Sequence, residues 1–240
     1  MSDTAAANIV SLQSNLIKVI APEGYTAGNV SVTFMGLKLT GTSLSPSVPE
    51  GDVSSFYMQN YEQPFTSDLM TPAQIGSSGK WAVADYWKIN SGGLDQLNSG
   101  ATARTGGLSY GNMATGELIL QAGWGDAIGN TLNNAKLYQT MSLPAGNYSF
   151  EVNINNFSFV SGSTTYIVAA AKDSIPDIGE VASYSISYTN FNDVSSSNNA
   201  TKRTLNFTLS SYSTVSVGFV STQIANSWFR VGLVRLNLIK

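Results

Sequence analysis

The chain has 240 residues, a formal net charge of −3 and 11% charged residues, against about 25% in an ordinary soluble domain. Ser, Thr, Asn, Gln and Gly supply its polarity, and it has no basic stripe of the kind that nucleic-acid binding requires. His and Cys are absent, which excludes Ser-His-Asp and Cys-His catalysis, Cys-ligated zinc and disulfides.

The first part of the chain has the pattern of a small β-domain. Apolar residues alternate with polar ones, or cluster, in three segments that are expected to be strands: 16–20, 30–39 and 54–61. Residues 41–51 have the Pro, Gly and Ser content of a loop, and residues 71–80 that of a linker. We therefore predict a small Ig-like β-sandwich domain over residues 1–72 and a second domain over residues 73–240.

The segment after the linker is rich in aromatic residues and glycine. WAVADYWKIN, residues 81–90, has three aromatic side chains within seven positions, and residues 91–112 form a long Gly-rich stretch. A loop of that length without regular structure is often functional in a compact domain. Residues 117–122 are expected to form a strand that leads into a turn around Trp124.

Residues 134–238 have the pattern of successive strands. In KLYQTMSL (136–143) and NYSFEVNI (147–154), apolar and polar residues largely alternate, and the short connection Pro144-Ala145-Gly146 is expected to join them as a hairpin. Further strands are expected at 164–172, 181–189, 204–211, 215–222 and 227–239. Helix is sparse, with one turn expected near 174–182. The predicted fold class is therefore all-β, with a sandwich or jelly roll as the second domain.

Several of these segments resemble one family. In chain order they are DYWKIN with GGLD, LILQAGWG, NAKLYQTMSLPAGNYSFEV, YIVAAAKDSIPDIGEV, SVGFV and WFRVGLVRL. Over residues 78–240 they resemble the C-terminal galactose-binding-like jelly-roll β-sandwich domain of Bacteroidetes cell-surface lipoproteins from polysaccharide-utilisation systems. The earlier segment LIKVIAPEGYTAGNVSVTFMGL resembles the small Ig-like or carboxypeptidase-regulatory-like β-domains that often precede such modules.

This resemblance implies a poly- or oligosaccharide ligand, SusC/SusD-like transporter proteins as partners, and contact with a membrane only through a lipid anchor. No lipid-bearing Cys is present, so we expect that it was removed with a signal segment. The expected location is the cell surface, lipid-anchored at the outer membrane, or the secreted fraction. A structural Ca²⁺, the usual metal in jelly-roll binding modules, is possible and would be held by carboxylates and backbone carbonyls. The chain has no calcium-loop motif, however, and no metal ligands or cofactors are assigned.

The candidate ligand-binding residues are aromatic rings, on which sugar C–H faces stack, and polar groups that bond to hydroxyls. Trp124, between two glycines, is the main candidate platform, and Arg104 in the long loop offers a guanidinium donor. The full set is Trp124, Arg104, Tyr110, Asn112, Asp95, Trp81 and Trp228. A place in the core is the alternative for Trp228 and the favoured interpretation for Trp87.

The predicted function is non-catalytic capture of a glycan at the cell surface, by aromatic stacking and neutral hydrogen bonds. Two alternatives stay open. A structural or adhesion protein would use the same aromatic residues in its core or in a protein interface. A glycoside hydrolase would need two carboxylates about 5–10 Å apart, with Asp85, Asp95, Glu117 and Asp126 as candidates.

Overall fold

The computed structural model shows a chain of strands with few and short helices. It describes residues 8–13, 16–20, 28–44, 50–67, 81–94, 107–109, 116–123, 131–191, 196–197 and 199–239. The chain divides into two compact units, Met1–Val48 and Pro49–Lys240. The prediction of an all-β fold is confirmed.

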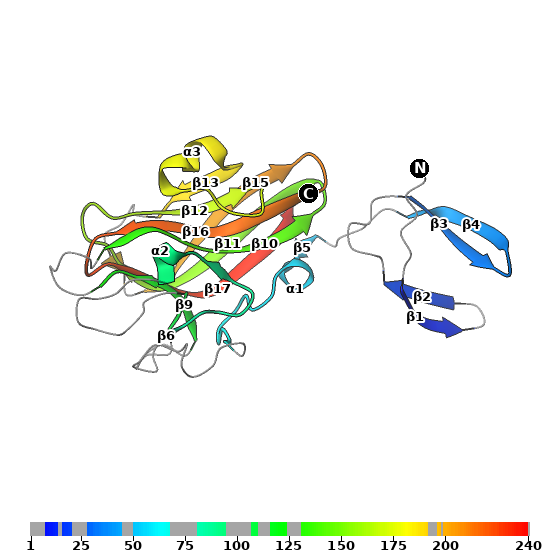
Figure 1. Ribbon diagram of the computed structural model, residues 1–240, viewed down its shortest axis with the longest axis horizontal. Helices are drawn as coiled ribbons and strands as arrows, with labels where there is room; N and C mark the ends of the chain where they lie inside the picture. The colour runs from blue at the N-terminus through cyan, green and yellow to red at the C-terminus, as the bar shows by residue number, and fades with distance from the viewer. Residues whose placement is uncertain are drawn as a thin grey trace. The chain divides into compact units, whose positions relative to one another are not determined.

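In the first unit, the described residues form two antiparallel hairpins (Figure 1). The strands are β1 (Asn8–Gln13), β2 (Leu16–Ile20), β3 (Gly28–Phe34) and β4 (Leu37–Leu44). Met35 and Gly36 connect β3 to β4, and both have positive φ, 47° and 83°. Two successive residues with positive φ give a turn whose twist matches that of the flanking strands. The strand predicted over 16–20 is confirmed, but the single strand predicted over 30–39 is two strands, because the chain reverses at Met35 and Gly36.

The second unit is a jelly-roll β-sandwich of two antiparallel sheets (Figure 1). The smaller sheet contains, in order, β13 (Ser187–Asn190), β12 (Thr164–Ala170), β16 (Ser213–Gln223), β10 (Leu132–Leu143) and β7 (Lys88–Ile89). The larger sheet contains β14 (Ser196–Ser197), β11 (Gly146–Ser158), β17 (Trp228–Ile239), β9 (Glu117–Gln121), β8 (Gly107–Ser109) and β6 (Trp81–Ala82). β15 (Thr201–Leu209) also pairs with β11, and β5 (Gly51–Asp52) pairs with β17.

The main core lies between the two sheets. Every second side chain of β10 from Ala135 to Leu143 is buried, as the alternation in the sequence predicts. Phe219 of β16 and Phe229 of β17 are fully buried and meet across the two layers, with ring centroids 5.2 Å apart. Aromatic contacts of this kind join the sheets into one hydrophobic core.

The predicted hairpin of 136–154 is wrong, although both of its strands exist. β10 pairs with β16 and β7, whereas β11 pairs with β14, β15 and β17, so the two strands lie in opposite sheets. The connection through Pro144 crosses from one layer to the other. Alternation shows that one face of a strand is buried, and a strand on either side of a sandwich has that same pattern.

The strand predicted over 54–61 is also wrong. Ser54–Tyr57 form a short helix, α1, and the chain then runs along the edge of β17. Val234 N donates to Tyr61 O at 2.8 Å, and Gln63 N donates to Gly232 O at 2.9 Å. Met58, within the segment predicted as a strand, and Val53, just before that segment, are buried in the second unit.

These contacts place the division between the units earlier than the predicted boundary after residue 72. Residues 50–67 pack with the second unit, because β5 pairs with β17 and Phe65 is buried against Trp87, with ring centroids 6.3 Å apart. The composition of residues 71–80 therefore does not mark the division, which falls after Val48.

The helices of the second unit are single turns. Besides α1 they are α2 (Ser91–Leu94), the 3₁₀ turn η1 (Ile178–Glu180) and α3 (Val181–Tyr184). The turn expected near 174–182 is confirmed, but the strand predicted over 181–189 begins only at Ser187. No helix among the described residues has the length and hydropathy to cross a membrane.

Candidate functional site

Most of the predicted ligand-binding residues lie outside the described residues. They are Asp95, Arg104, Tyr110, Asn112 and Trp124. For Trp81 the structure describes the backbone, which pairs with Ser109 as part of β6. The role predicted for these six residues stays a prediction.

Trp228 is the predicted site residue whose side chain the structure describes. It begins β17, is partly exposed, and donates from its indole Nε1 to Asn156 Oδ1 at 3.3 Å. Trp87, in contrast, is buried and donates from Nε1 to Asn60 O at 2.9 Å. A core position for Trp87, which its apolar context favoured, is confirmed.

Two of the four candidate catalytic carboxylates are described, and both are buried in structural contacts. Asp85 accepts from Thr66 Oγ1 at 3.3 Å. Glu117 accepts from Asn155 Nδ2, and its Oε2 lies 3.7 Å from Arg230 Nη1. Asp95 and Asp126 lie outside the described residues.

A cleft on the outer face of the smaller sheet is a better described candidate site. After β12 the chain leaves the sheet, passes through η1 and α3, and returns to it as β13. The segment between β12 and β13 is anchored on the sheet by a small apolar cluster, in which Ile175 and Val181 pack against Val168 and Val220. Burial of those side chains fixes a segment that carries polar residues on its other side.

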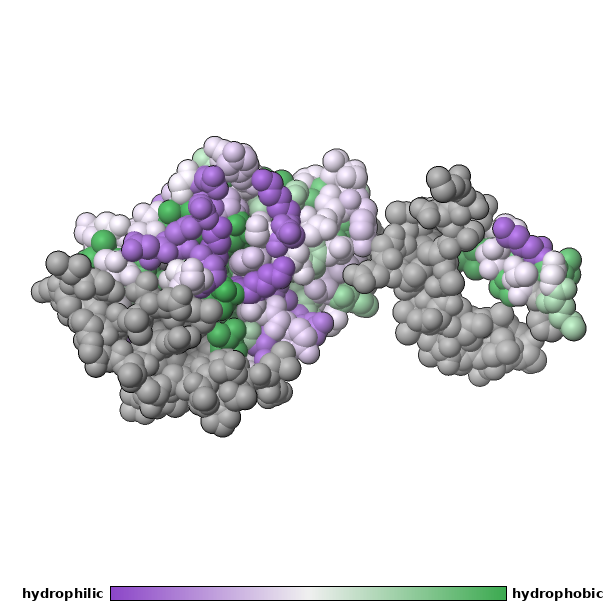
Figure 2. Space-filling view, in the orientation of Figure 1, coloured by the Kyte–Doolittle hydropathy of each residue, from purple (hydrophilic) through white to green (hydrophobic). Residues whose placement is uncertain are grey.

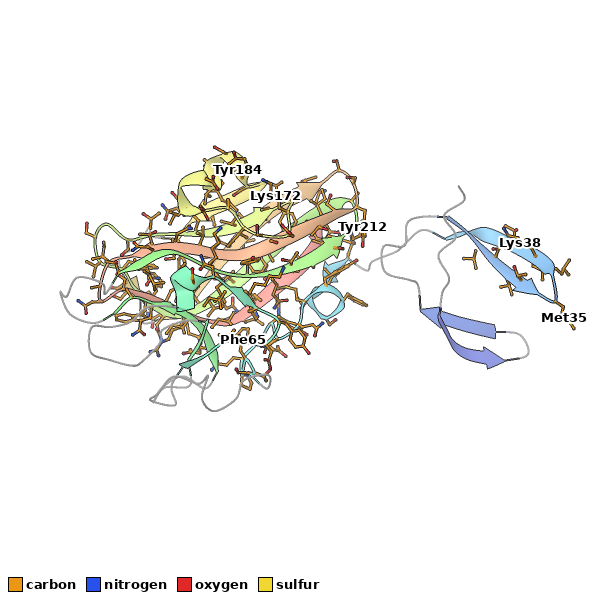
Figure 3. All side chains as sticks on the ribbon, in the orientation of Figure 1. Met35, Lys38, Phe65, Lys172, Tyr184 and Tyr212 are labelled. Atoms are coloured by element: carbon orange, nitrogen blue, oxygen red, sulfur yellow. The ribbon has the colours of Figure 1, made fainter. Side chains whose placement is uncertain are left out.

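The cleft has a volume of about 320 Å³ and lies between this segment and β10. We call it the tyrosine cleft; its lining residues are Lys136, Lys172, Ser174, Ile175, Pro176, Asp177, Glu180 and Tyr184. Figure 3 shows Lys172 and Tyr184 together at the α3 segment, with Tyr212 well away from them. In the view of Figure 2, hydrophilic residues run across the second unit beneath α3.

Ionic contacts fix the base of the tyrosine cleft. Lys136, whose side chain is 15% exposed, forms an ion pair with Asp177 and donates from Nζ to Ile175 O at 3.0 Å. The hydrogen bond from Lys136, followed by one involving Asn134, lowers the pKa of Asp177 below its ordinary value. Asp177 is therefore an acceptor with its charge already compensated.

Tyr184 forms one wall of the cleft and is 51% exposed. The ammonium group of Lys172 lies over its ring, 4.5 Å from the centroid, which is the geometry of a cation–π contact. The ring is thus held in place at one face without being buried.

Further tyrosines share this face of the smaller sheet. Tyr166 and Tyr188 meet edge to face with centroids 5.7 Å apart, and Tyr188 is 45% exposed. Tyr138 lies under the ammonium group of Lys88, 5.7 Å from the centroid. Burial, and then the charge of Asp173, raise the pKa of Tyr138, so its hydroxyl stays protonated and able to donate.

Sequence reasoning missed the tyrosine cleft, although one signal was present. Four of the nine residues from 172 to 180 are charged, in a chain with 11% charged residues. This charge cluster lies directly before the tyrosines at 184 and 188. The alternation SYSISY predicts a half-buried strand, whereas Tyr184 ends the helix α3 and is exposed.

The fold and the cleft define an antiparallel β-sandwich with a tyrosine-lined polar cleft on one outer face. The profile of one protein family, "Domain of unknown function (DUF5013)", matches residues 59–218, so the chain belongs to the DUF5013 family. No curated protein matches the chain.

Solved structures resemble the chain at low identity. An apo-form cyclase from Fischerella sp. has a TM-score of 0.42 and 13% identity over 76% of this chain and 89% of its own. The K3 cleaved adhesin domain of Lys-gingipain from Porphyromonas gingivalis has 0.37 and 12%, over 65% and 93%. The mannan-recognising carbohydrate-binding module TmCBM27 has 0.32 and 10%, over 77% and 98%. At these scores none of the three assigns a ligand to this chain.

Proposed function

We propose that the chain is a non-catalytic glycan-binding protein that holds a poly- or oligosaccharide in the tyrosine cleft. The observation that carries the proposal is the half-exposed ring of Tyr184 at the wall of a cleft lined by Lys172, Asp177 and Glu180. Sugars present C–H faces that stack on aromatic rings, and hydroxyl groups that donate and accept hydrogen bonds. An aromatic wall with a few convergent polar groups suits both parts of such a ligand.

The charge balance of the cleft favours a neutral glycan. The two lysines and the two carboxylates of its lining compensate one another formally, and Lys136 and Asp177 are already paired. Charged groups of both signs still bond to hydroxyls, and those bonds are stronger than bonds between neutral partners. Tyr188 and Tyr166, on the same face, offer further rings to a longer saccharide.

We propose further that the protein acts at the cell surface, lipid-anchored or secreted, and passes glycan to SusC/SusD-like transporter proteins. This part rests on the resemblance of residues 78–240 to the jelly-roll domains of surface lipoproteins. The absence of catalysis is likewise a proposal, supported by the structural partners of Asp85 and Glu117.

A glycan array followed by titration calorimetry tests the proposed function. With any glycan that binds, Tyr184→Ala is expected to weaken affinity about tenfold, equivalent to ~1.4 kcal/mol. Tyr212→Ala is the matched control, because Tyr212 is 41% exposed and does not line the cleft. Equal affinities of the two variants would show that the glycan binds elsewhere. An array without any ligand at millimolar concentration would refute glycan binding itself.

Protein adhesion is the second candidate function, and the β3–β4 hairpin favours it. Val32, Leu37 and Leu39 are 41%, 65% and 61% exposed, and Val32 is directly opposite Leu39 in the hairpin. Exposed apolar side chains grouped on one face are a common feature of interaction surfaces. A negative glycan array together with self-association that Leu37→Ser abolishes, measured by sedimentation, would support this function instead.

A further inference from the structure

We infer that the larger sheet carries a second binding site, for the hydroxyl groups of a neutral saccharide, on the face turned away from the core. The site is a groove of about 320 Å³ that we call the amide groove. Its lining residues are Gln63, Asn153, Asn155, Ala200, Thr201, Lys202, Gly232 and Leu233. It is separate from the tyrosine cleft, which lies on the other sheet, and it does not depend on the function proposed for that cleft.

A local irregularity of the ladder between β11 and β17 creates the groove. Asn153 pairs with Leu233, Ile154 with Val231 and Asn156 with Arg230. Asn155 and Gly232 are therefore left without a partner in the register, one on each strand. Irregularities of this kind change the direction of a side chain and are common beside functional sites.

Gly232 forms part of the groove because a side chain does not fit there. A Cβ at this position would lie 2.6 Å from Asn155 Oδ1 and 2.7 Å from Asn155 Nδ2. The amide of Asn155 thus lies directly over the glycine. A larger residue at position 232 would displace this amide and fill the groove.

Two hydrogen bonds within the protein fix the orientation of the Asn155 amide. Its Nδ2 donates to Gln63 Oε1 at 3.2 Å and also to Glu117 Oε1. Glu117 is 4% exposed and has Arg230 as its ion-pair partner. Both amide protons of Asn155 are thereby used within the protein, so Oδ1 is presented as a hydrogen-bond acceptor.

The other groups of the groove are neutral or compensated. Asn153 contributes an amide that both donates and accepts, and Thr201 contributes a hydroxyl whose proton goes to Asn199 O at 3.3 Å. Lys202 is paired with Glu151 at 2.7 Å. Such a set matches the vicinal hydroxyls of a sugar, each of which donates and accepts, better than a charged ligand.

Two sites on opposite sheets would make one chain bivalent. A single polysaccharide chain, or two, could then be held on both faces of the sandwich, and avidity would exceed the affinity of either site alone. This property goes beyond capture at the tyrosine cleft.

Side-chain amide signals in ¹H–¹⁵N correlation spectra test the inference directly. The probes are the methyl glycosides of glucose, galactose and mannose, each titrated into the full chain. At least one is expected to shift the NH₂ signals of Asn153 and Asn155 in a saturable way. Asn153→Ala should weaken this binding about tenfold, while Asn206→Ala, an exposed asparagine on β15 outside the groove, should leave it unchanged.

Three outcomes would overturn the inference: no shift at Asn153 and Asn155 with any of the three probes, shifts that persist unweakened in Asn153→Ala, or shifts that vanish in Tyr184→Ala. If Asn153→Ala does not fold, Thr201→Val serves in its place and is judged by the same criteria. Failure of the tyrosine cleft alone gives a different result. In that case Tyr184→Ala leaves the glycan affinity measured by calorimetry unchanged, while the NH₂ signals of Asn153 and Asn155 still shift.

Discussion

Gly218 stands in the middle of β16, opposite Tyr138 of β10, at a point where a side chain would collide with the neighbouring strand. A Cβ there would lie 2.3 Å from Leu137 O and 2.6 Å from the Cα of Tyr138. Backbone atoms in the centre of a sheet have no room to withdraw. The position therefore requires glycine for steric reasons rather than for its φ.

Gly218→Ala is expected to lower the free energy of unfolding by about 1–3 kcal/mol, the usual cost of overpacking. Urea unfolding followed by circular dichroism measures the change. Gly179→Ala is the control, since a Cβ at Gly179 meets nothing within 4 Å, and its effect should stay within about 0.5 kcal/mol. Equal stability of the two variants would mean that β10 shifts at no cost.

Tyr148 is a buried titratable residue between the two sheets. It is fully buried, stacks on Phe207 with centroids 5.4 Å apart, and donates from its hydroxyl to Pro144 O at 2.9 Å. Burial, and then the neighbouring Tyr57, raise the pKa of Tyr148 from 10.0 to about 12. The folded state therefore favours the protonated form more strongly than the unfolded state does.

This raised pKa predicts an alkaline loss of stability. The contribution of Tyr148 is fully present below pH 10.0, the unfolded value, and is lost as the pH rises toward about 12. Tyr148→Phe cannot ionise, so its free energy of unfolding should fall less steeply over this range than that of the wild type. Parallel pH profiles in urea unfolding would contradict the assignment.

At the scale of single elements, β17 has one edge that is covered by several separate segments of the chain. One edge pairs with β11, while the other is covered in succession by β9, by residues 61–63, by Val53 and by β5. Between residues 61–63 and Val53, Ser54 Oγ accepts from Leu236 N at 2.8 Å. A side chain thus completes a ladder that backbone alone leaves open.

Ser54→Ala removes this acceptor and leaves a buried N–H without a partner. We expect a loss of about 1–3 kcal/mol in the free energy of unfolding. Ser55→Ala, on the exposed side of α1, is the control and should change stability by less than about 0.5 kcal/mol. Thermal and urea unfolding of both variants give the comparison, and equal losses would place the effect in the helix rather than in the hydrogen bond.

The sequence predicted strands well and their partners poorly. Alternation located β10 and β11 because burial of one face imposes a period of two, but nothing local distinguishes a hairpin from a crossing between sheets. The hydrogen bond of Ser54 to β17 could not be predicted either, because no pattern in the neighbouring sequence marks a serine that bonds to a strand far along the chain. The tyrosine cleft was missed because α3 turns Tyr184 outward within a segment whose alternation predicts a strand. Within the loop predicted over 91–112, the described residues 91–94 and 107–109 form α2 and β8 instead. Arg104 and Trp124 lie outside the described residues, and their roles stay predictions.

At the scale of the whole molecule, residues 50–67 belong to the sandwich and not to a separate domain. They bury Val53, Met58 and Phe65, and they cover the edge of β17. Removing them would expose apolar core and a row of unpaired backbone groups, which favours aggregation.

A chain that begins at residue 49 is therefore expected to fold into the second unit with a cooperative urea transition. A chain that begins at residue 73, the boundary suggested by composition, is expected to aggregate or remain unfolded. Size-exclusion chromatography and circular dichroism distinguish these results. A soluble, cooperative chain of residues 73–240 would show that the packing of residues 50–67 is dispensable.

The position of β17 in the sequence also has a consequence for biosynthesis. β5, β9 and β11 all precede it, and Ser54 is 182 positions from Leu236, with which it bonds. At about 5–20 residues per second, roughly 10–40 s separate the emergence of these two residues from the ribosome. During that interval the backbone of Val53 and the hydroxyl of Ser54 lack their partner Leu236, so the nascent chain should depend on chaperones until β17 arrives and completes the larger sheet.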